Sequence, residues 1–215
     1  MIIKPMIRSN ICINAHPVGC AKDTEHQIEY VKSQKAKRGV KTAKEGGYAP
    51  KTVLILGCST GYGLASRISA AFEYGADTIG VSFEKEPTET KSGTPGWYNN
   101  TAFDRAAKKD GLKSSTFNMD AFSDECRQTV IDEVKKWNAK FDLVVYSLAS
   151  PVRVDPDTKV MYRSVIKTIG EPCTGPALDM MTGKISEMTA EPAVGDDVTN
   201  TVKVMGGEDW ERWIT

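Results

Sequence analysis

From residue 50 onward, short runs of aliphatic residues alternate with longer segments in which apolar residues recur every three or four positions. The short runs are typical of buried strands, and the longer segments are typical of amphipathic helices. The first run, KTVLIL, lies between Pro50 and Gly57, which both favour a boundary. The predicted strands are 51–56, 78–83, 113–118 and 141–146, and the predicted helices between them are 62–74, 99–110 and 124–137.

Strands and helices in strict alternation predict parallel strands joined by right-handed crossovers, with helices on both faces of one sheet. We therefore expect an α/β fold with a doubly wound, Rossmann-like parallel sheet in residues 50–215. Residues 1–49 are expected to be an extension: a strand or hairpin over 1–20, a helix over 23–34 and a Lys- and Gly-rich connector. After the fourth strand we expect an irregular hairpin insertion with strands near 162–169 and 184–190, then helices over 196–214 that break at Gly206-Gly207.

Composition and charge exclude several classes of protein. The chain has 28 Lys+Arg and 28 Asp+Glu, and such a balance argues against a nucleic-acid binder. No apolar stretch approaches the roughly 18 residues that a membrane span needs, and the first residues do not form a secretory signal. Five cysteines without a CxxC pair are typical of reduced thiols, so we expect a cytoplasmic location and no membrane or nucleic-acid partner.

A glycine loop, GCSTGYG over 57–63, lies between the first predicted core strand and the first predicted core helix. In this context one glycine permits a tight turn, another lets the backbone approach a phosphate, and a third packs helix on strand. The N–H groups at the start of the helix can then hold a pyrophosphate. No Lys-Ser/Thr follows, so this is not a Walker loop. The alternative is a turn that only permits tight packing.

The ends of the other strands carry candidate ligand contacts, because parallel sheets bind ligands at their carboxyl edge. Glu84 can accept hydrogen bonds from the adenosine ribose hydroxyls and repel a 2′-phosphate, which favours NADH over NADPH; Lys85 can soften that preference. Asp120 can hold the adenine amino group, and small residues at 147–150 let the backbone lie against the nicotinamide ribose. The alternatives are a solvated charge at Glu84, a turn residue at Asp120 and a plain strand end at 147–150.

Other candidate sites are weaker. Cys12, His16 and Cys20 recur at four-residue steps, but a structural zinc site usually needs a fourth ligand and close cysteine pairs, so no metal is predicted. Cys58 is either a thiol activated by a helix N-terminus or a small residue in the loop. The basic residues between 35 and 44 favour a solvated linker over a phosphate-binding surface.

Several segments of unusual sequence resemble, in order and spacing, the NADH-dependent trans-2-enoyl-CoA reductases. This family includes the single-domain bacterial enoyl-acyl-carrier-protein reductases and belongs with the short-chain dehydrogenase/reductase superfamily. The resemblance runs from Ile2 to Ile214 and includes HPVGC near the N-terminus. The segments are GCSTGYGLASRI, SFEK, GTPGWYNN, DAFSDE, VVYSLASPVR and TVKVMGGEDWERWI.

The resemblance implies an oxidoreductase of fatty acid synthesis that reduces the 2,3 double bond of an acyl thioester with NADH. The substrate would be carried by CoA or an acyl carrier protein, and the protein would be a monomer or weak homodimer. The implied contacts are Gly57, Cys58, Ser59, Thr60, Gly61 and Tyr62 with the pyrophosphate, Phe83 and Glu84 with the adenosine ribose, Asp120 and Ala121 with the adenine, and Leu148 and Ala149 with the nicotinamide ribose.

The catalytic pair of the family, a tyrosine and a lysine eight residues apart, lies downstream of the GGEDWERW stretch. The resemblance therefore places no catalytic residue in this chain and implies a catalytic half after residue 215. Tyr162 and Lys167 do not substitute, because a spacing of five puts them on opposite faces of the expected strand. The main prediction is an NADH-dependent enoyl thioester reductase. The alternatives are an NAD-binding fragment without catalytic activity and a carbonyl-reducing relative.

Overall fold

The structure is a computed structural model that describes residues 6–8, 11–12, 14–180 and 182–214. The described residues divide into two compact units. The first holds residues 14–121 and 125–148. The second holds residues 122–124 and 149–214 together with a short N-terminal hairpin, in which β1 (Ile7–Arg8) pairs with β2 (Ile11–Cys12).

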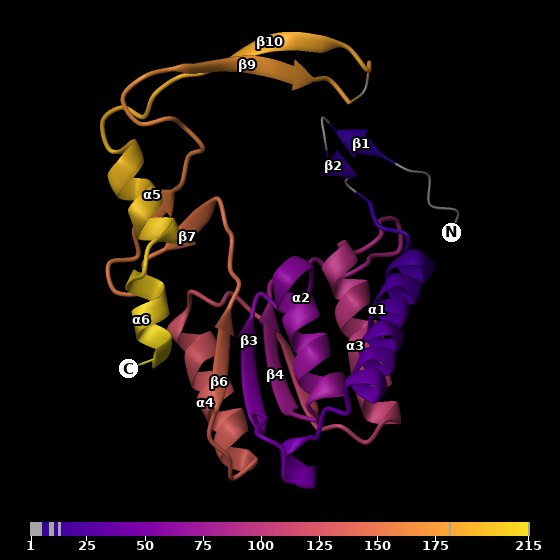
Figure 1. The fold of residues 1–215 in the computed structure, drawn as a ribbon. Coiled ribbons are helices and arrows are strands. Elements are labelled where there is room, and N and C mark those ends of the chain that lie inside the picture. Colours follow the sequence, from indigo (N-terminus) through magenta and orange to yellow (C-terminus); the bar gives the residue numbers. More distant parts are fainter. Residues whose placement is uncertain (1–5, 9–10, 13, 181, 215) are drawn as a thin grey trace. The chain divides into compact units, whose positions relative to one another are not determined.

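A four-stranded parallel sheet forms the centre of the first unit (Figure 1). Its order is β5-β4-β3-β6, and every pairing is parallel. All residues of β3 are buried, as the continuous aliphatic run predicts for a central strand covered on both faces. The doubly wound α/β prediction is therefore confirmed. The strands are β3 (Thr52–Leu56), β4 (Asp77–Ser82), β5 (Ser114–Asn118) and β6 (Leu143–Tyr146).

Helices cover both faces of this sheet, and neighbouring residues of β5 show which helix lies on which face. Ser115 donates a hydrogen bond to Glu133 of α4 (Asp124–Lys136), over 2.7 Å. Thr116 donates one to Asp104 of α3 (Pro95–Lys109), over 2.8 Å. Because adjacent side chains of a strand point to opposite faces, α3 and α4 lie on opposite sides of the sheet.

The helix after β3 is shorter than the predicted 62–74. α2 (Gly61–Ile68) is α-helical, and the chain then continues as the π-helical turn η2 (Ser69–Glu73). Gly75 ends this segment with a φ of +68°, and its N–H donates to the carbonyl of Ala71. The predicted glycine stop is confirmed, but periodicity alone did not show the change of helix type.

The N-terminal helix is longer than predicted at both ends. α1 spans Pro17–Arg38, whereas the sequence pattern predicted 23–34. The imidazole Nδ1 of His16 accepts a hydrogen bond from the N–H of Gly19 over 2.9 Å and caps the helix, and Pro17 occupies the first turn. Gly39 ends the helix with a φ of +61°. The predicted connector therefore begins after Arg38 and includes a short 3₁₀ helix, η1 (Ala43–Glu45).

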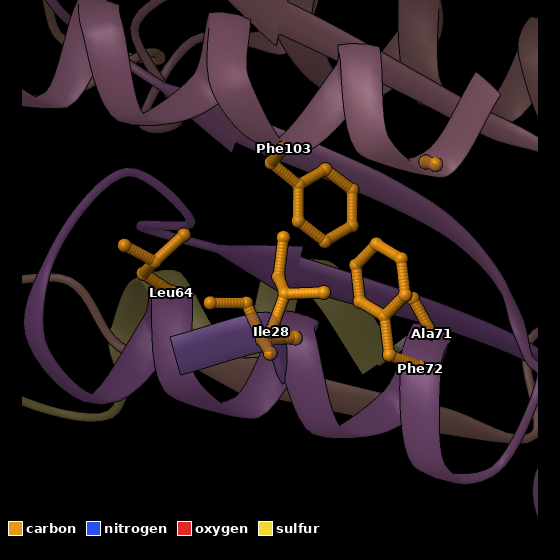
Figure 2. Close-up of a cluster of buried hydrophobic side chains, with 7 residues drawn as sticks. Ile28, Leu64, Ala71, Phe72 and Phe103 are labelled. Atoms are coloured by element: carbon orange, nitrogen blue, oxygen red, sulfur yellow. The ribbon is translucent and has the colours of Figure 1, made fainter. Parts of the chain in front are cut away.

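One apolar core cluster of the first unit lies where α1, α2 and η2 pack against α3. Figure 2 shows the side chains of Ile28, Leu64, Phe72 and Phe103 pointing into one shared space. The Phe72 and Phe103 rings meet edge to face, with centroids 5.6 Å apart. The N-terminal extension is therefore part of this unit's core through Ile28, which is 4% exposed.

The second unit consists of small antiparallel ribbons and two helices. The expected strand near 162–169 is shorter than predicted, because β8 ends at Arg163. The break between the two C-terminal helices at Gly206-Gly207 is confirmed. None of the helices in the described residues combines the length and the apolar composition that a membrane span requires. The elements are β7 (Val152–Val154) paired with β8 (Met161–Arg163), β9 (Cys173–Leu178) paired with β10 (Ile185–Ala190), α5 (Asp197–Met205) and α6 (Glu208–Ile214).

A buried guanidinium joins α2 to the sheet. Arg67 lies on the inner face of α2, and its side chain is 0% exposed. The guanidinium carbon lies 4.1 Å from the centre of the Phe103 ring. A Cβ at Gly80 of β4 would lie 2.6 Å from that carbon, which explains a glycine within a central strand. The guanidinium donates to the Thr78 and Thr116 hydroxyls, the Ser115 carbonyl and the Cys58 thiol, and lies 3.6 Å from the Asp104 carboxylate.

Replacing Arg67 with methionine is expected to lower the free energy of unfolding by about 3 kcal/mol, because the Asp104 carboxylate and the Ser115 carbonyl lose their cationic donor. Urea unfolding followed by circular dichroism measures this loss. Arg105→Met, at an exposed position of α3, is the matched control and is expected to change stability by less than about 0.5 kcal/mol. Equal losses in the two variants would contradict a special role for the buried guanidinium.

Candidate functional site

The chain turns sharply where β3 ends. Gly57 has a φ of +83°, and its N–H donates to the carbonyl of Val81 over 2.9 Å. A Cβ at Gly57 would lie 2.1 Å from the carbonyl oxygen of Ser147. Both the backbone conformation and the lack of space therefore require glycine at this position.

The other two glycines of the loop have different roles. A Cβ at Gly63 would lie 1.9 Å from the carbonyl oxygen of Gly57, so the first turn of α2 packs directly against the strand end. Gly61 has a φ of +53°, and a Cβ there would meet no heavy atom within 4 Å. Gly61 therefore faces open space, where a ligand can approach the backbone.

The N-terminus of α2 presents its N–H groups at this open side. Thr60 has extended backbone angles at the N-cap, and its side chain makes no capping hydrogen bond. The N–H of Leu64 makes the first helical bond, to the carbonyl of Thr60 over 3.1 Å. The earlier N–H groups of a helix have no intrahelical acceptor, and the helix dipole adds partial positive charge. Such a terminus fits a pyrophosphate.

The end of β4 lies beside this loop. Phe83 is 78% exposed, so its ring is available to a ligand. The Asn118 side chain of β5 holds the backbone of Glu84 through two hydrogen bonds. The Glu84 N–H donates to the amide oxygen of Asn118 over 2.6 Å, and the amide nitrogen of Asn118 donates to the Glu84 carbonyl over 2.9 Å. The backbone of Glu84, one of the two predicted ribose contacts, is therefore fixed at the strand end.

The remaining predicted contacts follow the other two strands. The N–H of Met119 donates to the carbonyl of Ser82 over 2.8 Å, and Asp120 and buried Ala121 come next. The N–H of Ser147 donates to the carbonyl of Leu56 over 2.9 Å, and Leu148 follows it. The sheet order thus brings these residues to one carboxyl edge with the glycine loop at its centre. Ala149 belongs to the second unit.

Two asparagines of α3 support the glycine loop and were not predicted as site residues. Asn99 donates from its amide to the carbonyl of Ser59 over 2.9 Å. Asn100 donates to the Ser82 hydroxyl over 2.9 Å, and its amide oxygen lies 3.5 Å from the Cys58 sulfur. The prediction started this helix at Asn99, but α3 begins at Pro95. The overlooked signal is the pair Thr94-Pro95, an N-cap residue followed by proline in the first turn.

The Cys58 thiol is not activated. Burial raises the pKa of this thiol, and the opposing effect of the Arg67 charge is smaller. Because the side chain is 0% exposed, Cys58 serves the loop as a small packing residue. The hypothesis of an activated thiol is therefore wrong.

The weaker candidates take structural roles. His16 caps α1 through its ring nitrogen. In the described part of the chain, no three His, Cys, Asp or Glu side chains are grouped as metal ligands. In the second unit, Lys167 pairs with Asp197 over 2.8 Å, and Tyr162 lies beneath the ammonium of Lys203.

The sequence matches two family descriptions that together cover nearly the whole chain. Residues 2–89 match the NAD(P)H binding domain of trans-2-enoyl-CoA reductase, and residues 91–215 match the trans-2-enoyl-CoA reductase catalytic region. The chain belongs to the trans-2-enoyl-CoA reductase family.

Relatives within this family cover the chain completely. It is 63% identical over 214 residues to a trans-2-enoyl-CoA reductase [NADH] of Treponema denticola, and 55% identical over 214 residues to an enoyl-[acyl-carrier-protein] reductase [NADH] of Idiomarina loihiensis. The alignments include 100% of this chain but 53% and 52% of those proteins. The chain thus spans about half the length of these curated relatives.

Solved structures of the family agree with the fold. The crystal structure of the Treponema denticola trans-2-enoyl-CoA reductase in complex with NAD superposes with a TM-score of 0.93 at 62% identity, and covers 100% of this chain and 53% of that one. A Clostridium acetobutylicum trans-2-enoyl-CoA reductase in complex with NADH gives a TM-score of 0.87 at 43% identity, covering 99% of this chain and 51% of that one.

Proposed function

We propose that this chain binds NADH along the carboxyl edge of its sheet and forms the cofactor-binding half of an NADH-dependent trans-2-enoyl thioester reductase. The observation that carries the proposal is the turn at 57–63, which presents the N-terminus of α2 at the centre of that edge. The identity of 63% to an NADH-dependent relative supports the choice of cofactor and reaction.

Each strand end has a role in this proposal. The N–H groups at the start of α2 donate to the pyrophosphate oxygens, and the open side of Gly61 leaves room for them. Glu84 accepts hydrogen bonds from the adenosine ribose hydroxyls, and Phe83 lies against the same sugar. Asp120 and Ala121 hold the adenine, and Leu148 and Ala149 lie along the nicotinamide ribose.

NADH supplies the hydride that reaches C3 of the thioester, and C2 then takes a proton. The residues of this chain bind and orient the dinucleotide. We infer that the proton donor is the tyrosine and lysine pair that the resemblance implies, and that this pair lies in the half of the relatives that this chain does not span. A tyrosine hydroxyl there would donate a hydrogen bond to the developing enolate, and the lysine would lower the pKa of that tyrosine.

The exposed side of β6 supports a catalytic half beyond residue 215. Strands of parallel sheets are usually covered on both faces. β6 is an edge strand whose Leu143 is 44% exposed, and its other residues are half-buried. Further strands and helices from the other half would pair with this edge and cover it.

The second unit supports the same proposal. Phe122 and Val204 are its only buried large apolar side chains among the residues that the structure describes. A unit that buries so little apolar surface gains little stability from its own core. Large apolar side chains remain exposed on its ribbons and connections, including Ile166, Ile169, Leu178, Ile185 and Met188. The remaining half of the protein would cover part of this surface.

The thioester is carried by CoA or an acyl carrier protein, since the names of the relatives include both. The thiols of Cys20, Cys58 and Cys173 are free, which supports a reducing, cytoplasmic location. We expect a monomer or weak homodimer without membrane or nucleic-acid partners.

Gly61→Val is expected to weaken NADH binding at least about 100-fold, because the added methyl groups occupy the space in which the pyrophosphate meets the backbone. Titration of cofactor fluorescence measures the affinity. Gly111→Val is the matched control, because Gly111 also has a positive φ (+69°) with no heavy atom near its Cβ, but it lies at the C-terminal end of α3. Equal NADH affinity in the two variants would show that the glycine loop does not contact NADH.

The 215-residue chain mixed with NADH and crotonyl-CoA is expected to bind NADH without oxidising it. Joining the chain to the second half of the Treponema denticola relative is expected to restore loss of NADH absorbance. Turnover by the 215-residue chain alone would contradict the placement of the catalytic pair. Turnover of the joined protein on a ketoacyl thioester instead of the enoyl substrate would identify a carbonyl reductase.

Glu84→Ala is expected to shift the ratio of NADPH to NADH affinity toward NADPH by about one to two orders of magnitude, because the carboxylate no longer repels the 2′-phosphate. Lys85→Ala, which removes the neighbouring cation, is expected to shift the ratio the other way. Competition titrations of both cofactors measure the ratio. An unchanged ratio in Glu84→Ala would remove this residue from the ribose site.

A further inference from the structure

The carboxylate of Glu84 is held by two hydroxyl groups from different elements. Ser59 of the glycine loop donates to its Oε1 over 2.5 Å, and Thr94, the N-cap residue of α3, donates to its Oε2. Ser59 is itself buried, with 6% of its surface exposed. Hydrogen bonds to an ionised acceptor are stronger than those between neutral groups, so both oxygens are fixed.

The space around this carboxylate is also closed on one side. A Cβ at Gly96, in the first turn of α3, would lie 2.2 Å from Oε1 of Glu84 and 2.7 Å from the Cβ of Ser59. The φ of Gly96 lies outside the left-handed region, so its backbone does not require glycine. The absence of a side chain at this position therefore matters because Glu84 and Ser59 pack against it.

The negative charge of the Glu84 carboxylate is fixed, and it also lies where the dipole of α3 stabilises it. The start of α3 carries the partial positive charge of the helix dipole, which stabilises a carboxylate beside it. A free glutamate at a strand end samples many rotamers and can turn its charge toward solvent. Here Ser59, Thr94 and Gly96, together called the Glu84 clamp, remove that freedom.

We propose that the Glu84 clamp sets the preference for NADH over NADPH by holding the Glu84 carboxylate in one orientation at the ribose site. This inference rests on the proposed function of Glu84. Each carboxylate oxygen has two lone pairs, and each accepts one hydroxyl from the clamp. One acceptor position on each oxygen therefore remains for the ribose hydroxyls. The 2′-phosphate of NADPH is repelled by the Glu84 carboxylate, because the clamp prevents this carboxylate from rotating away.

The Glu84 clamp also couples two parts of the site. Ser59 lies in the pyrophosphate loop, and its hydroxyl holds the acid of the ribose site. Thr94 lies outside the glycine loop, and its N–H donates to the carbonyl of Lys85 over 3.0 Å. Thr94→Val therefore tests the orientation of Glu84 without changing the loop itself.

The test compares Thr94→Val, Ser59→Ala and Gly96→Ala in the 215-residue chain, with NADH and NADPH titrated against each. Each variant is expected to shift the NADPH to NADH affinity ratio toward NADPH by about threefold to tenfold, because it releases or displaces the carboxylate. Thr101→Val, a hydroxyl of α3 that bonds to the carbonyl of Trp97, is the matched control and keeps the wild-type ratio. A purely structural role would weaken both cofactors equally and leave the ratio unchanged.

A Thr94→Val/Glu84→Ala double variant separates the clamp from the proposed function. If the clamp acts through Glu84, the double variant has the ratio of Glu84→Ala alone. If Glu84→Ala shifts the ratio but all three clamp variants keep the wild-type value, the clamp does not set the cofactor preference, and the ribose role of Glu84 remains. If Glu84→Ala also leaves the ratio unchanged, both are overturned.

Discussion

The close approach of two backbone segments, the end of β3 and the first turn of α2, is the constraint on which the site depends. A Cβ at Gly63 would lie 1.9 Å from the carbonyl oxygen of Gly57, so the helix starts directly above the strand end. Its first N–H groups therefore point outward at the sheet edge, where the helix dipole favours an anion. The proposed ribose and adenine contacts lie at the same edge as this turn, because β4 and β5 end there.

Side chains of α2 and α3 hold this turn in place. Arg67 reaches from α2 to the sheet and contacts the Cys58 thiol of the loop. Asn99 holds the carbonyl of Ser59 from α3, and Ser59 in turn holds Glu84. The loop is therefore fixed by polar contacts on two sides before a ligand binds. Such preorganisation lowers the entropic cost of binding.

The sequence pattern predicts the sheet well for a physical reason. Strands buried on both faces need continuous aliphatic runs, so residues 51–56 and 141–146 stand out, and alternation with helices fixes parallel pairing. The glycine spacing predicts the loop, because Gly57 and Gly63 have no room for a side chain. Helix starts were predicted less well, since the His16 side chain caps α1 and Thr94-Pro95 begins α3, and neither signal is periodic.

The supporting contacts could not be predicted from the pattern. Arg67 occupies an inner position of an otherwise apolar helix face, and an isolated charge in such a pattern usually indicates solvent exposure. Its burial depends on acceptors from β4, β5 and α3, which are distant in sequence. The packing of Glu84 against Gly96 likewise depends on the fold, because the two residues come from different elements.

A crystal structure of this chain with NADH would show whether the glycine loop holds the dinucleotide. We expect pyrophosphate oxygens within hydrogen-bond distance of the N–H groups at the start of α2, above Gly61. A cavity of about 240 Å³ offers a clear contrast, because it is lined by Lys35, Lys44 and Asp110 near the amino ends of the strands. Density for the dinucleotide in that cavity, or anywhere other than above the glycine loop, would show that the N-terminus of α2 is not the pyrophosphate site.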